Sequence, residues 1–81
     1  MAKSLHTSGY DHFRSLLVSA RMKAGLTQTG VSAKLGRPQS FVAKYEGGER
    51  RLDVIEFVQV CVALGVDPCT IISQVQENIE V

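Results

Sequence analysis

Helix-breaking residues divide this chain into short segments, and their spacing limits the fold more than any other feature. Glycine or proline stands at positions 25, 36, 38, 47, 48, 65 and 68. Between these positions, apolar residues recur three or four places apart, as they do on one face of an amphipathic helix. The pattern therefore predicts an all-α domain built from five short helices.

The first two helices are bounded by residues with known capping behaviour. Residues 1–9 have no sustained apolar period, so we expect a flexible N-terminal arm there and a first helix from Tyr10 to the stop at Gly25. Thr27 can cap the second helix through its hydroxyl, and Gly36 ends that helix.

The next two helices have similar starting signals. Pro38 suits the first turn of a third helix, in which Val42 and Tyr45 would face inward. Asp53 can cap a fourth helix over residues 54–64. This helix has too many apolar residues for a one-sided stripe, so it is predicted to be buried on most sides; a strand remains the alternative.

A last helix completes a single domain over residues 10–81. Asp67 can cap this helix, and Pro68 suits its first turn. A length of 81 residues, with 44% hydrophobic and 21% charged residues, suits one soluble core. There is no bilayer-spanning apolar run of about 18 residues and no secretory signal pattern, so we expect a cytoplasmic location and no membrane partner.

Cysteine and histidine form no metal-binding pattern. Cys61 and Cys69 are eight positions apart, unlike a redox pair or a zinc-ligand pair, and are predicted to be buried free thiols. His6 and His12 are isolated and are interpreted as surface residues. We expect no metal, no cofactor and no small-molecule ligand.

Charge is divided unequally along the chain, although the net charge is only +1. Residues 14–51 contain eight basic and two acidic residues, whereas residues 52–81 contain five acidic and no basic ones. Only the first of these regions could face phosphates. The two short helices in it, joined by a tight connection, have the layout of a helix-turn-helix. A plain helical interaction module fits this layout equally well.

The residues themselves favour DNA binding. Leu26-Thr27-Gln28, the pair Gln39-Ser40, Glu46 before glycine and Arg50-Arg51-Leu52 are the most specific pieces of a segment, residues 26–68, that resembles the lambda-repressor-like (XRE) helix-turn-helix family. The resemblance extends from about residue 10 to residue 75. It implies the five-helix fold of that family, with the third helix in the major groove.

The resemblance also implies contacts for the polar residues around the third helix. Base edges would be read by Gln39, Ser40 and Lys44, because glutamine can pair with adenine, lysine can donate to guanine and serine accepts several partners. Phosphates would be held by five residues that flank these. They are Thr27, Gln28, Arg37, Arg50 and Arg51.

In relatives, the positions of Arg21 and Glu46 form an ion pair that ties the first helix to the third. The chain departs from the family at Gly30, where glutamate is frequent, and at Ser32, where alanine is usual. Gly30 excludes a capping box and should soften the second helix. Phe41 is expected to pack inside or to be partly exposed, in preference to contacting a thymine methyl group.

A dimer is expected, because related regulators place two copies on half-sites about one helical turn apart. The predicted interface is the apolar face of the last helix together with the fourth helix, and a self-contained monomer is the alternative. The interface residues of the last helix are Ile71, Ile72, Val75 and Ile79.

The sequence therefore predicts a bacterial or phage transcriptional regulator, a repressor in our interpretation, that binds double-stranded DNA as a homodimer. Phage-type repressors, antitoxin-like regulators and restriction-modification controllers all fit. The alternative is an interaction module or antitoxin-like partner that keeps the fold, with DNA binding secondary. An enzyme is not expected, because no spacing brings a nucleophile to a base.

Overall fold

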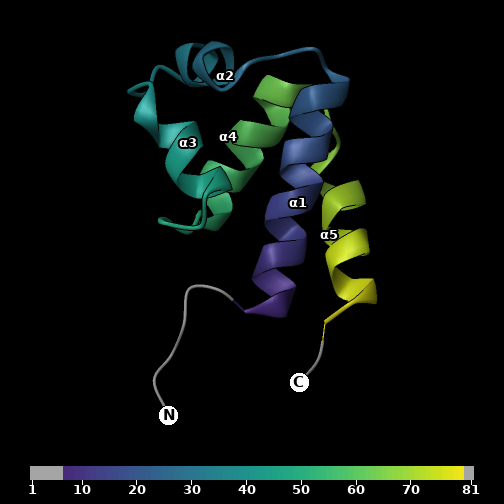
Figure 1. The fold of residues 1–81 in the computed structure, drawn as a ribbon. Coiled ribbons are helices and arrows are strands. Elements are labelled where there is room, and N and C mark those ends of the chain that lie inside the picture. Colours follow the sequence, from purple (N-terminus) through teal and green to yellow (C-terminus); the bar gives the residue numbers. More distant parts are fainter. Residues whose placement is uncertain (1–6, 80–81) are drawn as a thin grey trace.

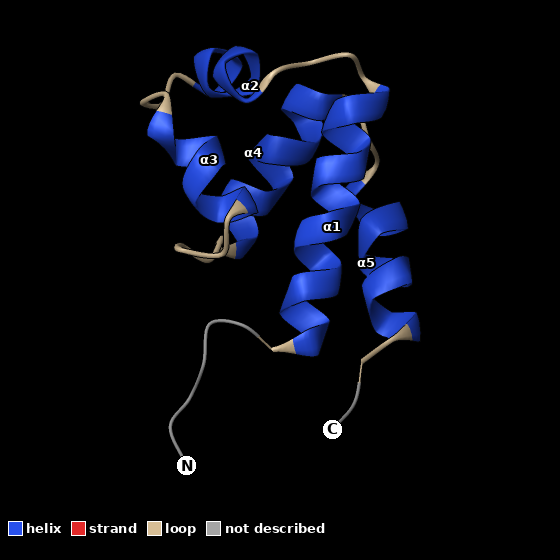
Figure 2. Cartoon of the chain, viewed as in Figure 1, coloured by secondary structure: helices blue, strands red, loops and turns tan. Residues whose placement is uncertain are grey.

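Five α-helices build the protein in the computed structural model, which describes residues 7–79 (Figures 1 and 2). They are α1 (Ser8–Lys23), α2 (Gln28–Leu35), α3 (Ser40–Glu46), α4 (Val54–Leu64) and α5 (Pro68–Glu77). This stretch contains no strand, so the prediction of an all-α fold is confirmed. In Figure 1, α1 and α5 run side by side, and α4 packs against both α2 and α5.

The first helix begins earlier than its apolar pattern indicates. Thr7 is the N-cap residue, and its Oγ1 accepts a hydrogen bond from the Tyr10 N–H at 3.1 Å. Ser8 and Gly9 are therefore helical, and the prediction of a flexible arm is wrong for them, because a hydroxyl cap can start a helix before its first apolar residue. The rest of the predicted arm, residues 1–6, lies outside the described residues.

The other predicted caps are found in the structure. Thr27 Oγ1 accepts from the Gly30 N–H at 3.0 Å, and Asp67 Oδ1 accepts from the Cys69 N–H at 2.9 Å. Gly36 ends α2 in the left-handed conformation, with φ of 66°, where a residue with a side chain would be strained. The start of α3 is later than predicted: Pro38 lies in the turn before the helix, and its carbonyl accepts from the Phe41 N–H at 2.9 Å.

The hydrophobic core joins all five helices. Val42 and Tyr45 of α3 are fully buried, as their spacing predicted, and Phe41 is also buried, with its ring 5.6 Å from that of Tyr45. Burying side chains of this size stabilises a fold by roughly 1.5–3 kcal/mol each. The buried apolar residues are Leu17, Val31, Phe41, Val42, Tyr45, Phe57, Val60, Cys61, Leu64 and Ile71.

Two predictions about burial are wrong. The helix α4 is not buried on most sides, because Val54, Ile55 and Val62 are 74%, 68% and 75% exposed. Only the side of α4 that faces α2 and α5 enters the core of this small molecule. Of the two free thiols, Cys61 is buried, which raises the pKa of its thiol to about 11, but Cys69 is exposed at the start of α5.

Within residues 7–79, no single helix is both long and apolar enough to cross a membrane. The pair α4 and α5 reaches the necessary length and hydropathy only together, and it is bent by 117°. The same residues hold no cluster of three or more His, Cys, Asp or Glu side chains that could bind a metal ion.

Candidate nucleic-acid interface

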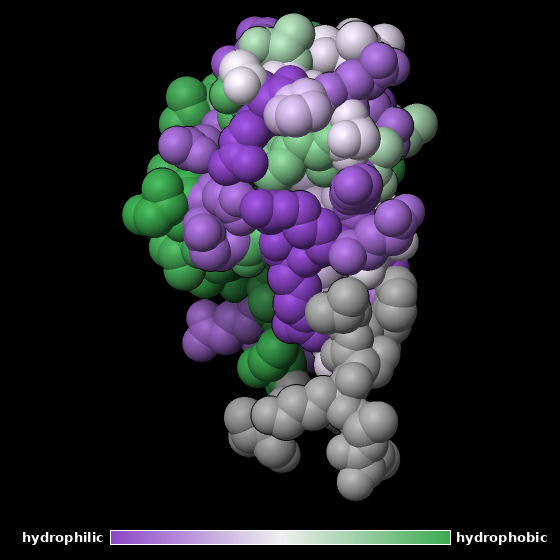
Figure 3. Space-filling model, turned by 90° about the vertical axis from the view of Figure 1, so that its left-hand side faces the viewer, coloured by the Kyte–Doolittle hydropathy of each residue, from purple (hydrophilic) through white to green (hydrophobic). Residues whose placement is uncertain are grey.

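A hollow lies between α2 and α3 on the outside of the molecule, and most of the residues around it are polar. It is lined by Gln28, Thr29, Gln39, Ser40 and Ala43. Gln39 and Ser40 are exposed at the start of α3, and Lys44 is exposed one turn further along the helix. The three residues predicted to read bases thus share one accessible surface. Figure 3, which views the molecule from the side of α2 and α3, shows hydrophilic atoms across its centre.

Ser32 of α2 fixes the start of α3. Its hydroxyl is buried; it donates to the Gln39 carbonyl at 3.3 Å and accepts from the Val42 N–H at 3.4 Å. That N–H is in the first turn of α3 and has no partner within the helix. The N-cap residue, Gln39, makes no capping bond with its side chain. Ser32 takes over this task, so the Gln39 amide can extend outward, where its Nε2 donates to Thr29 Oγ1 at 3.1 Å.

The departure from the family pattern at Ser32 therefore has a structural reason and gives a prediction. Ser32→Ala is expected to lower the free energy of unfolding by about 1 kcal/mol, because a buried N–H at a helix start loses its acceptor. Urea denaturation measures this change. The matched control is Ser19→Ala on the exposed surface of α1, for which we expect a change below about 0.5 kcal/mol. Equal stability of the two variants would contradict the capping role.

An ion pair between α1 and α3 supports this surface from behind. Arg21 Nε lies 2.8 Å from Glu46 Oε2, and Arg21 Nη2 donates to Glu46 Oε1 at 3.1 Å. The side chains are 15% and 5% exposed, so the pair is largely shielded from water. The hydrogen bond to Glu46 raises the pKa of Arg21, which stays charged. The pair inferred from the resemblance is thus present in the geometry.

Gln28 belongs to the same network, which its sequence position did not indicate. Its Nε2 donates to Glu46 Oε1 at 2.8 Å, and the side chain is only partly exposed. In this structure the Gln28 amide therefore does not point outward to meet a phosphate as predicted, because it is bonded to the buried carboxylate of Glu46. Gln28 thereby links α2 to the ion pair that joins α1 and α3.

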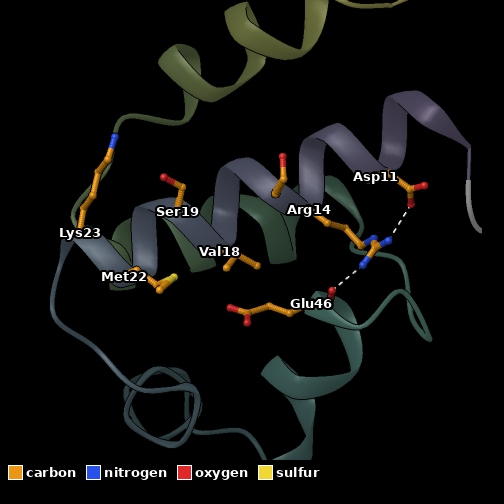
Figure 4. A pocket seen from close by; sticks show the side chains of 8 residues that line it. Asp11, Arg14, Val18, Ser19, Met22, Lys23 and Glu46 are labelled. Atoms are coloured by element: carbon orange, nitrogen blue, oxygen red, sulfur yellow. Dashed lines mark hydrogen bonds and ion pairs between the residues drawn. The ribbon is translucent and has the colours of Figure 1, made fainter.

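Arg14 is a structural residue that sequence reasoning counted only as a positive charge. Its Nη1 donates to the backbone carbonyl of Glu46 at 2.6 Å, and its Nη2 pairs with Asp11 at 2.7 Å (Figure 4). A cation that bonds the last carbonyl of α3 is favoured there by the helix dipole. The groove beside it in Figure 4 is lined also by Val18 and Met22 of α1. No sequence signal at Arg14 indicates this long-range contact.

A second carboxylate gathers two of the arginines predicted to bind phosphate. Glu56 in the first turn of α4 accepts from Arg50 in two-pronged geometry, at 2.8 and 2.6 Å, and from Arg37 at 3.1 Å. The guanidinium carbons of Arg37 and Arg50 lie over the ring of Phe41, 4.5 and 5.0 Å from its centroid. Asp53 completes the cluster through a capping box with Glu56. We call these five residues the Glu56 cluster.

The comparisons with known proteins agree with this geometry. A family model described as a helix-turn-helix domain matches residues 12–71. The solved structure of an XRE-family like protein from Pseudomonas syringae pv. tomato str. DC3000 is 46% identical in sequence, covers 90% of this chain and 89% of that one, and has a TM-score of 0.85. The chain belongs to the XRE family of helix-turn-helix proteins.

A more distant structure shares the fold of this XRE-family domain. The clp gene regulator ClgR from C. glutamicum has a TM-score of 0.78 at 16% identity, over 94% of this chain and 99% of that one. Among curated proteins, none has a significantly matching sequence. Membership of the XRE type identifies the chain as a DNA-binding helix-turn-helix domain.

The two remaining residues predicted to contact phosphates, Thr27 and Arg51, are both exposed in this XRE-family domain. Thr27 is exposed, but its hydroxyl oxygen is engaged as the cap of α2. A Cβ added at Gly30 would lie 3.2 Å from that oxygen, a tight contact that a small shift of the Thr27 side chain would have to relieve. Arg51 lies over the ring of Tyr10 at 4.4 Å, and Tyr10 Oη accepts from the Leu52 N–H at 3.1 Å. Tyr10 thus anchors the loop between α3 and α4 to α1.

The Glu56 cluster predicts a loss of stability in acid. Hydrogen bonds from Arg50 first, then from the Asp53 N–H, lower the pKa of Glu56 from about 4.5 to about 2. Since the folded pKa lies below the unfolded one, this contribution is complete above pH 4.5 and disappears as the pH falls toward about 2. Urea denaturation at several pH values should show a stability difference between the wild type and Glu56→Gln that narrows across this range. A constant difference would contradict the prediction.

Proposed function

We propose that this XRE-family domain is a sequence-specific transcriptional regulator that places α3 in the major groove of its operator. The observation that carries the proposal is the accessible surface of Gln39, Ser40 and Lys44, whose side chains suit base edges. This surface is fixed from behind by Ser32 and by the Arg21–Glu46 pair. A rigid support of this kind is what a base-reading helix requires.

The charge distribution supports the same orientation. Arg37, Arg50 and Arg51 lie close to α3 in the chain, and their side chains reach the surface at least in part. The segment of residues 52–81, which includes α4 and α5, contains five acidic residues and no basic one. Phosphates on both sides of the groove would therefore approach the α2–α3 side of the molecule.

Binding to DNA in a salt series tests the proposal. Each phosphate neutralised by an arginine contributes about −0.9 to the slope of log K against log salt, so three arginines give a slope of about −3 for each domain. Fluorescence anisotropy with a labelled random duplex measures the nonspecific slope. Selection from a random pool then identifies the preferred sequence. Absence of binding to any duplex in dilute buffer would refute the function and leave an interaction module.

Substitutions on α3 should separate reading of bases from folding. Gln39→Ala and Lys44→Ala are each expected to reduce discrimination between the selected site and a scrambled one by about 5- to 100-fold, the value of one good base contact. Circular dichroism should show unchanged helix content. Lys23→Ala, an exposed lysine at the end of α1, is the matched control and should keep full discrimination. Unchanged preference in both α3 variants would refute the base-reading assignment.

The domain acts as a homodimer in this proposal, with an interface centred on α4, one of the two helices that the sequence predicted to form it. Ile71 lies in the core at 3% exposure, and Val75 packs partly against the core, so the prediction is wrong for Ile71, which has no surface to offer. The largest exposed apolar side chains of this region lie mainly on α4. We assign the interface to Val54, Ile55, Val58, Val62 and Ile72.

A further inference from the structure

We propose that Glu56 is a positioning residue for DNA binding, which holds Arg37 and Arg50 ready to receive a phosphate. The inference rests on the proposed function and adds an acidic residue to its binding apparatus. At first sight Glu56 should oppose DNA, since it places a negative charge beside two residues that would neutralise phosphates. The geometry of the Glu56 cluster points to the opposite effect.

The carboxylate of Glu56 is saturated with hydrogen-bond donors. Its Oε1 accepts from Arg50 Nη1 at 2.8 Å and from the Asp53 N–H at 3.0 Å. Its Oε2 accepts from Arg50 Nη2 at 2.6 Å and from Arg37 Nη2 at 3.1 Å. A carboxylate with both oxygens engaged from two sides is fixed in one orientation, and the guanidinium groups that bind it are fixed as well.

The two guanidinium groups have a second support in Phe41. They lie over its buried ring, at 4.5 and 5.0 Å from the centroid, and the ring attracts cations through its π-electrons. Phe41 belongs to α3, while Glu56 belongs to α4. The two arginines therefore bridge the helix proposed to enter the groove and the helix behind it.

The exposure of the cluster suits a ligand from outside. The side chain of Glu56 is only 10% exposed, whereas those of Arg37 and Arg50 are 37% and 38% exposed. The contacts with Glu56 and the Arg51 carbonyl use one N–H of Arg37 and three of Arg50, which leaves further N–H groups for an incoming oxygen. Arg37 and Arg50 carry two positive charges against the one carboxylate that they bind, and Asp53, whose carboxylate caps α4, brings the whole cluster to a formal net charge of zero.

Because Arg37 and Arg50 are already held in place, they lose less conformational entropy when they bind a phosphate. An unrestrained arginine loses its rotamer freedom when it binds a phosphate, whereas an arginine already held in place loses little. Positioning and simple electrostatics therefore predict opposite signs for the neutral variant Glu56→Gln. Loss of a repelling charge alone would tighten DNA binding about twofold. Loss of positioning would weaken it, because Arg37 and Arg50 become mobile.

The experiment measures DNA affinity and its salt slope for Glu56→Gln beside two matched variants of the full chain. Glu49→Gln removes an exposed carboxylate from the loop that follows α3, so it reports the electrostatic effect alone. Asp53→Ala breaks the same capping box of α4 but retains both arginine contacts with Glu56, so it reports the effect of a weakened helix. Thermal melts followed by circular dichroism identify a temperature at which the wild type and the three variants are all folded, and DNA affinity is measured at that temperature.

We expect Glu56→Gln to bind the selected duplex about 5- to 10-fold more weakly than the wild type, with a salt slope smaller in magnitude by about 1 to 2. Glu49→Gln should bind as tightly as the wild type or more tightly, and Asp53→Ala should keep the wild-type slope. Wild-type or tighter binding by Glu56→Gln would overturn the positioning role, as would an equal loss in Asp53→Ala. If the wild type itself binds no duplex, the proposed function fails first, and this inference fails with it.

Discussion

Replacing Glu46 with alanine is expected to lower the free energy of unfolding by about 3–5 kcal/mol, a large share of the roughly 5–15 kcal/mol typical of a folded domain. The carboxylate accepts two hydrogen bonds from Arg21 and one from Gln28. Its removal leaves the Arg21 guanidinium, at 15% exposure, without its counter-charge. Urea denaturation followed by circular dichroism measures the loss.

Two further variants show whether the cost comes from the uncompensated charge. Glu49→Ala removes an exposed carboxylate three residues away and should change the stability by less than about 0.5 kcal/mol. The double variant Arg21→Met with Glu46→Leu removes both charges and should recover most of the loss, because a buried pair contributes little net stability compared with apolar side chains. A Glu46→Ala variant within 1 kcal/mol of the wild type would show that the pair is not needed for folding.

The stability of Glu46→Ala also affects how DNA-binding data are interpreted. Glu46 lies at the end of α3, two residues beyond Lys44, yet its side chain turns inward to Arg21. Loss of binding in a Glu46 variant would reflect lost folding and would not identify a DNA contact. Variants at Gln39 and Lys44, which are exposed, avoid this ambiguity.

Local features of the fold could be predicted from the sequence because they depend on neighbouring residues. The caps at Thr27, Asp53 and Asp67 and the left-handed end at Gly36 follow from side-chain chemistry within a few positions. The inward positions Val42 and Tyr45 follow from helical spacing. The outward surface of Gln39, Ser40 and Lys44 was found through the same spacing together with the family resemblance.

Contacts between distant residues could not be predicted in this way. Glu56 was interpreted only as part of an acidic region, but the fold brings it to Arg37, which lies 19 positions earlier. Gln28 was assigned to a phosphate, but α3 places Glu46 beside it. Charge counts give no information about which opposite charges meet, because that depends on how the helices pack. For the same reason, Arg14 gave no sign of its bond to the end of α3.

The apolar residues of α4 illustrate a different limit. Their number predicted burial on most sides, and in a larger core that inference would hold. Here the helix has α2 and α5 on one side and none of the described residues covering Val54, Ile55 and Val62. In Figure 3, hydrophobic atoms gather at the left edge, beside the hydrophilic centre. An apolar stripe of this kind on a small domain is typical of an interaction surface.

A second copy of the chain fits this stripe better than a charged partner does. Residues 57–66, which include Val58 and Val62, contain no charged side chain, so this part of the stripe offers no electrostatic complement to a charged surface. Val54, Val58 and Val62 are spaced four residues apart and therefore form one line along α4. Such a line on one helix can pack against its own symmetry copy, as in two-fold dimers in which the same patch serves both subunits.

Val62→Asp is therefore expected to dissociate the proposed dimer and to weaken binding to its selected DNA site by about 100-fold or more, because two linked half-sites gain roughly 10²- to 10⁴-fold over one. Val62 is 75% exposed in the single chain, so the charge should not disturb its core. Sedimentation velocity measures the oligomeric state, and anisotropy with a palindromic duplex measures the affinity. Ile79→Asp, at a position 54% exposed just beyond α5, is the matched control and should leave both unchanged. A dimeric Val62→Asp beside a monomeric Ile79→Asp would place the interface at the end of α5, the other part of the interface that the sequence predicted.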